Sequence, residues 1–178
     1  MIRMIVIVGE SACGKSSVAK YLMEHYGYKR IVTYTTRKPR DGEQDGVDYF
    51  YINQQHFKTL ENQGFFAETA TYNEWCYGSA KEDYKDNCVI VLTPRGLRSI
   101  RKSGVENIFT VYIDVPRRDR LIKCLERGDN IEEAYRRSLS DVGQFDGISD
   151  EVDLVVKNDK YLCSVKEIAD TIIKEMNS

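Results

Sequence analysis

The sequence predicts an α/β fold of three layers, in which a central parallel sheet lies between two layers of helices. First, strand-like and helix-like segments alternate through most of the chain, a pattern that favours parallel strands joined by helices. Second, residues 88–92 and 108–115 are short, uninterrupted apolar runs, which are typical of strands buried on both faces. Third, residues 33–85 interrupt the alternation with several short β segments and one short helix, which indicates an insertion.

The first elements of the chain form a motif for binding phosphate. The apolar run 4–8 is a predicted strand, and it leads into Gly-Glu-Ser-Ala-Cys-Gly-Lys-Ser at 9–16 and then into a helix-like segment. In the pattern G-x-x-x-x-G-K-S, the glycines let backbone N–H groups point at a phosphate. Lys15 can place a cation on the outer phosphates, and the Ser16 hydroxyl can bind Mg²⁺. The positive end of the following helix adds to this attraction.

We therefore expect the loop to bind a nucleoside triphosphate, the alternative being a Gly-rich turn with an exposed lysine. The residues expected at the triphosphate site are Gly9, Glu10, Ser11, Ala12, Cys13, Gly14, Lys15, Ser16 and Ser17. Cys13 has two interpretations: the helix end can lower the pKa of its thiol, or it is a small residue that fits the loop.

The next elements belong to the insertion. Residues 29–34 are β-rich, 37–48 form a polar loop, and 49–52 are strand-like. Asn53 can cap a short helix that carries Phe57 and Leu60 and ends near Gly64. Residues 65–72 are again β-like, with a turn at 73–74.

The second half returns to the alternating pattern. Pro94 starts a helix after the run 88–92, and Pro116 opens another after the run 108–115. In that second helix Leu121, Ile122 and Leu125 share a face, and Gly128 ends it. A charged stretch at 129–137 follows, then a strand at 152–156 and a helix at 164–176.

Composition excludes several classes of function. A chain of 178 residues with 42% hydrophobic residues, 30% charged residues and a net charge of −2 is typical of one globular domain. The sequence has no basic stripe of the kind that binds nucleic acid, and it has no apolar run long enough to span a membrane. The five cysteines form no C-x-x-C pair, which favours reduced thiols in the cytoplasm. The two histidines lie far apart, which argues against a histidine metal site.

A second polar cluster opens the insertion. Arg37 and Arg40 flank Pro39, and two arginines three residues apart can clamp a second phosphate, with Tyr49 adding a hydroxyl donor. Glu68 and Ser79 combine a carboxylate with a hydroxyl, which suits the edge of guanine. From these residues alone, an ordinary polar loop beside a tyrosine of the core remains the alternative.

The segments 9–17, 33–49 and 65–79 resemble guanylate kinase, a P-loop nucleoside monophosphate kinase. The family pattern S-x-T-T-R-x-P-R-x-G-E-x-x-G-x-D-Y matches residues 33–49, with Thr33 in place of the first serine. The resemblance implies the reaction of ATP with GMP in the presence of Mg²⁺. It implies that the phosphate of GMP is held by Arg37, Arg40, Tyr49 and Tyr77. It also implies that guanine is contacted by Thr33, Glu68 and Ser79.

The resemblance extends to the C-terminal half. Arg127 and one of Arg136 or Arg137 match arginines of the family's lid, where with Lys15 they would act on the transferring phosphate; a charged helix face is the alternative. Asn158 matches a segment near the adenine of ATP. The implied architecture is a P-loop NTPase-type three-layer α/β fold with a small mixed-β GMP-binding insertion and a helical lid. The core would comprise residues 1–32 and 86–178, the insertion 33–85, and the lid about 127–145.

The chain departs from the family pattern after the run 88–92. Two aspartates of the pattern are replaced by Val91 and Thr93, and Glu74 and Trp75 replace its Gly-Asn turn. We therefore keep three hypotheses: a guanylate kinase, a kinase of the same fold that acts on another nucleotide or a sugar phosphate, and a non-catalytic binding module. ATP and GMP are the expected partners, and the sequence does not set the oligomeric state.

Overall fold

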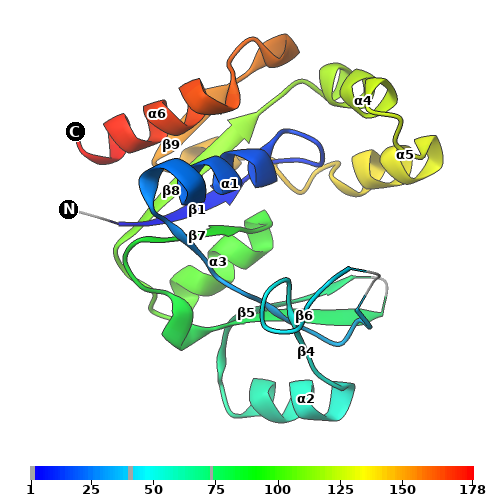
Figure 1. The fold of residues 1–178 in the computed structure, drawn as a ribbon, viewed down its shortest axis with the longest axis vertical. Helices are drawn as coiled ribbons and strands as arrows, with labels where there is room; N and C mark the ends of the chain where they lie inside the picture. The colour runs from blue at the N-terminus through cyan, green and yellow to red at the C-terminus, as the bar shows by residue number, and fades with distance from the viewer. Residues whose placement is uncertain (1–2, 40–41, 73) are drawn as a thin grey trace.

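The computed structural model describes residues 3–39, 42–72 and 74–178, and its central sheet has five parallel strands in the order β2-β7-β1-β8-β9 (Figure 1). The strands of this sheet are β1 (Met4–Val8), β2 (Lys29–Arg30), β7 (Cys88–Val91), β8 (Ile108–Asp114) and β9 (Leu154–Lys157). The predicted parallel sheet is confirmed, and the two apolar runs are its strands β7 and β8.

Helices cover both faces of the central sheet, as the fold class requires. Helices α1 (Lys15–Tyr26) and α6 (Val165–Met176) pack on one face, and α3 (Pro94–Lys102) packs on the other (Figure 1). Alternate residues of β1 serve the two cores: Ile5 and Ile7 join the cluster of α1 and α6, whereas Val6 joins the cluster of α3. This alternation follows from the two-residue period of a strand.

Side-chain caps fix where two of these helices begin. The Thr93 hydroxyl accepts the backbone N–H of Gly96 at the start of α3, where Pro94 occupies the first turn. Ser164 and Glu167 form a reciprocal capping box at the start of α6. Both starts agree with the sequence within a residue or two.

A second, smaller sheet of mixed direction has the order β4-β3-β6-β5 and lies beside α3 (Figure 1). Its strands are β3 (Tyr34–Thr35), β4 (Phe50–Tyr51), β5 (Phe66–Tyr72) and β6 (Trp75–Ala80). Strand β3 runs parallel to β4 and antiparallel to β6, and β5 runs antiparallel to β6. The β-rich segment 29–34 is therefore divided, because β2 belongs to the central sheet and β3 to this one.

Helix α2 (Gln54–Asn62) closes one side of the second sheet with aromatic contacts. Asn53 caps it by accepting the backbone N–H of His56, as the sequence predicts. The ring of Phe57 stacks on Phe66 with centroids 4.6 Å apart, and Tyr34 stacks on Phe50 at 4.7 Å. The second sheet thus has a small core of its own.

Helices α4 (Arg117–Glu126) and α5 (Ile131–Ser140) form a pair beside the phosphate loop (Figure 1). The charged stretch at 129–137 is largely the helix α5. The expected apolar face of α4 does not pack, because Ile122 is 42% exposed and Leu125 is 55% exposed. Among the described residues, no helix is long and apolar enough to cross a membrane.

Short 3-10 turns complete the chain. They are η1 (Lys81–Asp83), η2 (Ile148–Glu151) and η3 (Asp159–Tyr161). Turn η3 follows β9 and leads into α6, and η1 leads from the second sheet back toward β7.

Candidate active site

The loop at residues 9–16 joins β1 to α1 in a conformation that suits an anion. Ala12 and Gly14 have positive φ angles of 67° and 97°. A side chain on Gly9 would place its Cβ 2.8 Å from the carbonyl oxygen of Ile113, so only glycine fits there. In the described part of the chain, the backbone N–H groups of Ser16 and Ser17 donate to no acceptor. A helix start with open N–H groups is a ready site for phosphate.

The Lys15 side chain folds over this loop. Its Nζ donates to the backbone oxygen of Glu10 at 2.7 Å and lies 3.8 Å from Cys13 Sγ. Cys13 is 1% exposed, and burial raises the pKa of its thiol while the charge of Lys15 opposes the rise. The structure thus favours the interpretation of Cys13 as a small, neutral residue that packs under the loop.

Ser16 also borders a cleft that is lined by α1, β2 and β7 and by the residues just before β3 and β4. This cleft has a volume of about 610 Å³, and Thr33, Tyr49 and Val91 line it with Ser16. Arg30 lines the same cleft, with its guanidinium 6.0 Å from the centroid of the Tyr49 ring. Sequence reasoning missed Arg30, because a lone arginine at the end of a strand carries no pattern.

A group of aromatic and charged side chains surrounds Arg37, which is 6% exposed. Its Nη2 donates to both carboxylate oxygens of Glu43, at 2.8 and 2.9 Å, and the Tyr51 hydroxyl donates to the same carboxylate at 2.8 Å. Hydrogen bonding to Glu43 raises the pKa of Arg37 above its ordinary value. The Tyr49 ring lies 5.3 Å from this guanidinium and 6.0 Å from the Tyr77 ring.

The structure therefore brings Arg37, Tyr49 and Tyr77 together, three of the four residues expected at the acceptor phosphate. The fourth, Arg40, lies outside the described residues. Glu43 and Tyr51 are additions that the sequence did not reveal as partners of Arg37. Glu43 is part of the matched pattern, but spacing alone does not show that a carboxylate six residues away folds back onto the arginine.

Glu68 and Ser79 face each other across β5 and β6, at paired positions of the register. Both are buried, and the Ser79 hydroxyl donates to Glu68 Oε1 at 2.8 Å. The Tyr84 hydroxyl lies 2.5 Å from the same serine oxygen and extends the chain of hydrogen bonds. Burial raises the pKa of Glu68, and the bond from Ser79 opposes that rise. Tyr84 is a further missed residue, since a tyrosine in a loop gives no signal of its own.

Two of the expected lid arginines line a cavity on the other side of the phosphate loop. This cavity of about 300 Å³ is bordered by Ser11 and Ala12 of the loop and by Arg127 and Arg137. Arg127 forms an ion pair with Asp129, and Arg137 Nε donates to Glu133 at 2.8 Å.

Arg136 is placed differently from Arg137. It forms an ion pair with Glu133, one turn earlier on α5, and is not among the residues that border the cavity. Of the two neighbouring arginines, Arg137 is thus the one beside the phosphate loop.

Asn158 is 3% exposed, and its side-chain amide makes two hydrogen bonds inside the chain. It accepts the backbone N–H of Cys163 at 2.8 Å and donates to the backbone oxygen of Cys163 at 3.1 Å. These two bonds brace the turn η3, which follows Asn158. That turn reaches the phosphate loop through Tyr161, whose hydroxyl donates to the Ala12 oxygen at 2.8 Å. Burial raises the pKa of Tyr161 to about 12, so the hydroxyl keeps its proton.

The candidate metal ligand, Ser16, stands on the first turn of α1. Among the described residues, no group of three or more His, Cys, Asp or Glu side chains is arranged to hold a metal ion. Val91 lines the cleft beside Ser16, and the Thr93 side chain caps α3. Mg²⁺ keeps several waters and commonly takes substrate phosphate oxygens as ligands, so one hydroxyl fits it as a partial site.

Known proteins resemble this chain over nearly its whole length. A family model described as guanylate kinase matches residues 1–175. Guanylate kinase of Rickettsia prowazekii is 33% identical over 180 residues, which cover 96% of this chain and 90% of that protein. Guanylate kinase of Mycoplasma genitalium is 28% identical over 183 residues, which cover 97% of this chain and 76% of that protein.

A solved structure has a similar fold. The crystal structure of guanylate kinase from Anaplasma phagocytophilum matches with a TM-score of 0.67 at 21% sequence identity, over 99% of this chain and 85% of that chain. At that identity the likeness concerns the fold alone.

Proposed function

The chain belongs to the guanylate kinase family and is a nucleoside monophosphate kinase, and we propose that its phosphate loop and cleft transfer a phosphoryl group from ATP to GMP, giving ADP and GDP. The observation that carries this proposal is the position of Ser16. It belongs to the phosphate loop and also lines the cleft of about 610 Å³ that holds Thr33 and Tyr49. A donor and an acceptor can therefore meet at one residue.

The donor side is the phosphate loop with its lysine and the lid arginines. Lys15, Arg127 and Arg137 would spread positive charge over the transferring phosphoryl group. In this proposal Arg136 contributes through Glu133, which it shares with Arg137. Asn158 would support the adenine end of the ATP site indirectly, because its hydrogen bonds to Cys163 hold the turn η3 in place.

The acceptor side is the second sheet. Arg37, Tyr49 and Tyr77, with Arg40, would hold the phosphate of GMP, and the Glu43 carboxylate fixes the plane of the Arg37 guanidinium. Glu68 and Ser79 would contact guanine together with Thr33, which lines the cleft. No general base is required, because the attacking phosphate oxygen is already ionised. Alignment and charge neutralisation then supply the catalysis.

Mg²⁺ would be held by the Ser16 hydroxyl together with phosphate oxygens of ATP. When bound, it neutralises charge on those phosphates. Val91 and Thr93 carry no carboxylate, so the charge of the phosphates would be neutralised by Mg²⁺ on Ser16, by Lys15 and by the lid arginines. We therefore expect metal binding to depend less on protein carboxylates than it would with the two aspartates of the family pattern.

We assign three functional parts to the chain. Residues 1–32 and 86–178 form the kinase core, residues 33–85 the GMP-binding insertion, and residues 127–145 the lid. Closure of insertion and lid would exclude water as a competing acceptor. The five free cysteines support a cytoplasmic location. Nucleic acid and membranes are not part of the proposed function.

The decisive experiment measures ADP formation with ATP-Mg²⁺ and a panel of nucleoside monophosphates and sugar phosphates in a coupled assay. We expect turnover with GMP to exceed that with every other acceptor. Turnover with another acceptor but not with GMP would contradict GMP as the substrate. Binding of ATP in a thermal-shift assay with no turnover on any acceptor would indicate a binding module.

A further inference from the structure

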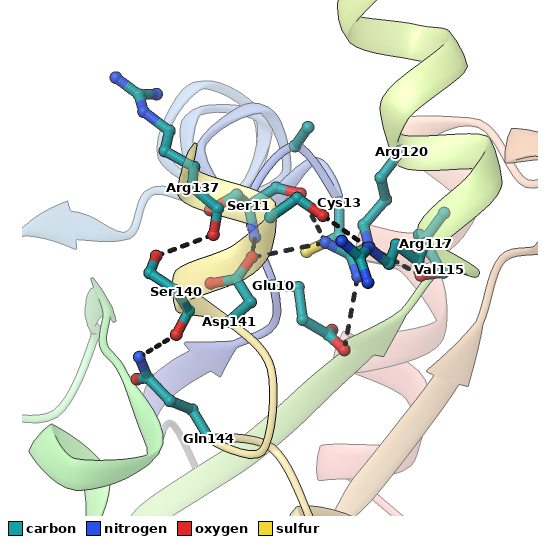
Figure 2. A network of polar contacts seen from close by, with 12 residues as sticks. Glu10, Ser11, Cys13, Val115, Arg117, Arg120, Arg137, Ser140, Asp141 and Gln144 are labelled. Carbon is teal, nitrogen blue, oxygen red and sulfur yellow. Dashed lines mark hydrogen bonds and ion pairs between the residues drawn. The ribbon is translucent and has the colours of Figure 1, made fainter. Parts of the chain in front are cut away.

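The phosphate loop is tied to the lid through a buried arginine that the proposed mechanism does not use. Arg120 of α4 has a side chain only 7% exposed, and a guanidinium buried to that degree needs partners for its charge and its donors. Its Nε donates to the Val115 oxygen at 3.0 Å, and its Nη1 donates to the Ser11 oxygen at 3.2 Å. Its Nη2 lies 3.8 Å from a carboxylate oxygen of Glu10 (Figure 2).

Asp141 completes this network from the other side. It is the residue that ends α5, and its Oδ2 lies 3.4 Å from Arg120 Nη1. The same oxygen accepts the backbone N–H of Ser11 in the phosphate loop at 2.8 Å. Figure 2 shows Asp141 between the loop and Arg120, with the side chain of Arg137 projecting away from the network. One carboxylate therefore joins the end of the lid helix to the loop.

Apolar packing does little to hold α5 in place. All of this helix lies in the described part of the chain, and its one buried residue is Ser138, which accepts a hydrogen bond from Arg117 Nε at 2.9 Å. Ile131 is 65% exposed, Tyr135 is 55% exposed and Leu139 is 47% exposed. Polar contacts such as that of Asp141 must then set where this helix lies relative to the loop.

The contact of Asp141 leaves the anion site open. It uses the N–H of Ser11, whereas the N–H groups of Ser16 and Ser17 donate to no acceptor in the described part of the chain. The carboxylate and a bound triphosphate can thus be present together, with Arg120 offsetting the negative charges of Asp141 and Glu10.

We propose that Asp141 is a positioning residue for phosphoryl transfer: with Arg120 it fastens the end of α5 to the phosphate loop and so places Arg137, one helical turn earlier, beside the transferring phosphate. This inference rests on the role of Arg137 in the proposed function. It assigns no contact between Asp141 and either nucleotide.

The test is a double-mutant cycle on kcat, with Asp141→Asn, Arg137→Ala and the double variant. Asparagine keeps an oxygen for the Ser11 N–H but loses the charge that faces Arg120. We expect Asp141→Asn to lower kcat about tenfold, because misplacement of a charged group is costly in the transition state, and to change KM for GMP less than about twofold. In the Arg137→Ala background, the same substitution should have almost no further effect on kcat.

Two further variants serve as controls for this test. Asp146→Asn, at an exposed aspartate of the same region, should keep the wild-type kcat. Asp141→Glu retains the carboxylate, and its kcat should fall less than about threefold. If the asparagine variant does not fold, the glutamate variant replaces it in the double-mutant cycle.

The outcomes separate the inference from the proposed function. A wild-type kcat for Arg137→Ala contradicts the role of Arg137 in the proposed function, and it therefore also contradicts the inference about Asp141. A large loss for Arg137→Ala, combined with an independent and additive loss for Asp141→Asn, contradicts the inference alone. Tighter ATP binding by Asp141→Asn also overturns it, because the carboxylate would then compete with phosphate.

Discussion

Glu68 shows how burial shifts the pKa of a single residue of the proposed acceptor site. The carboxylate is 7% exposed, and burial raises its pKa. The folded state therefore holds the proton at a higher pH than the unfolded state does. It follows that the free energy of unfolding falls as pH rises through the folded pKa of Glu68, so the ionised carboxylate costs stability at neutral pH. A residue that is retained at such a cost is a strong candidate for binding.

We expect Glu68→Gln to raise KM for GMP at least about tenfold, because a carboxylate can accept from both donors on the guanine edge and an amide cannot. Since only the ionised form accepts in this way, KM of the wild type should rise as pH falls through the Glu68 pKa, and KM of the variant should not. Steady-state kinetics across pH measures both. Glu82→Gln, at an exposed site of the same region, is the matched control. A parallel pH dependence in wild type and Glu68→Gln would refute this role.

The residues around Arg37 show where prediction from sequence ends. The resemblance predicted Arg37, Tyr49 and Tyr77 as neighbours, and the structure brings them together. It could not predict that Arg37 donates to Glu43 or that Tyr51 donates to the same carboxylate. Such contacts depend on how a loop folds back, and a linear spacing contains no information on that. Arg30 and Tyr84 were missed because a single arginine or tyrosine outside a motif gives no signal in the sequence.

At the scale of elements, the start of α3 lies against Glu68, a residue of the proposed guanine site. Thr93 caps the helix, and a Cβ on Gly96 would lie 3.4 Å from Leu92 and 3.6 Å from Glu68 Oε2. The first turn of α3 therefore packs directly against the acidic residue of β5. The family aspartate that Thr93 replaces would also be a good cap, since aspartate and threonine both accept the N–H two or three residues on.

We expect Thr93→Ala to lower the free energy of unfolding by about 1 kcal/mol, because the N–H of Gly96 loses its acceptor. Thr93→Asp should restore that free energy to within about 0.5 kcal/mol of the wild type, since aspartate caps as well as threonine does. Urea denaturation of the three proteins measures the difference. Ser103→Ala, at the far end of the same helix, controls for the loss of a hydroxyl that caps no helix start. Equal stability of Thr93→Ala and wild type would contradict the cap.

The elements that sequence predicted well are those whose signal is local. Strands β1, β7 and β8 are continuous apolar runs, Asn53 is the predicted cap of α2, and Pro94 marks the start of α3. The segment 29–34 was predicted as one β-rich segment, but its two ends pair in different sheets. Strand pairing is a long-range property that the local sequence does not reveal. The stretch 129–137 was interpreted from its charges alone, although Ile131, Tyr135 and Leu139 recur every four residues, as on one face of a helix; in α5 that face is exposed.

At the scale of the whole molecule, three parts meet at the phosphate loop. Thr33 and Tyr49 of the proposed insertion border the cleft that Ser16 lines, and α4 and α5 border the cavity beside Ser11. Both openings are lined by charged side chains, so each nucleotide would bring its own negative charge between two parts of the fold. Because both openings border the phosphate loop, we expect that closing one of them favours the loop geometry that the other nucleotide requires.

We therefore expect ATP and GMP to stabilise the protein more together than the sum of their separate effects. A ligand at about 100 times its Kd adds about 2.7 kcal/mol to the free energy of unfolding, and each 1 kcal/mol raises Tm by about 2–4 °C in a chain of this size. Coupling between two sites is typically about 1–3 kcal/mol, so the joint rise in Tm should exceed the sum by at least about 2 °C. Differential scanning fluorimetry with a non-hydrolysable ATP analogue and GMP measures this excess.

The control is Arg137→Ala, which removes the cation of the proposed lid that lines the cavity beside Ser11. In this variant the two shifts in Tm should simply add. Additive shifts in the wild type would mean that insertion and lid close independently, because neither nucleotide would then change the affinity for the other.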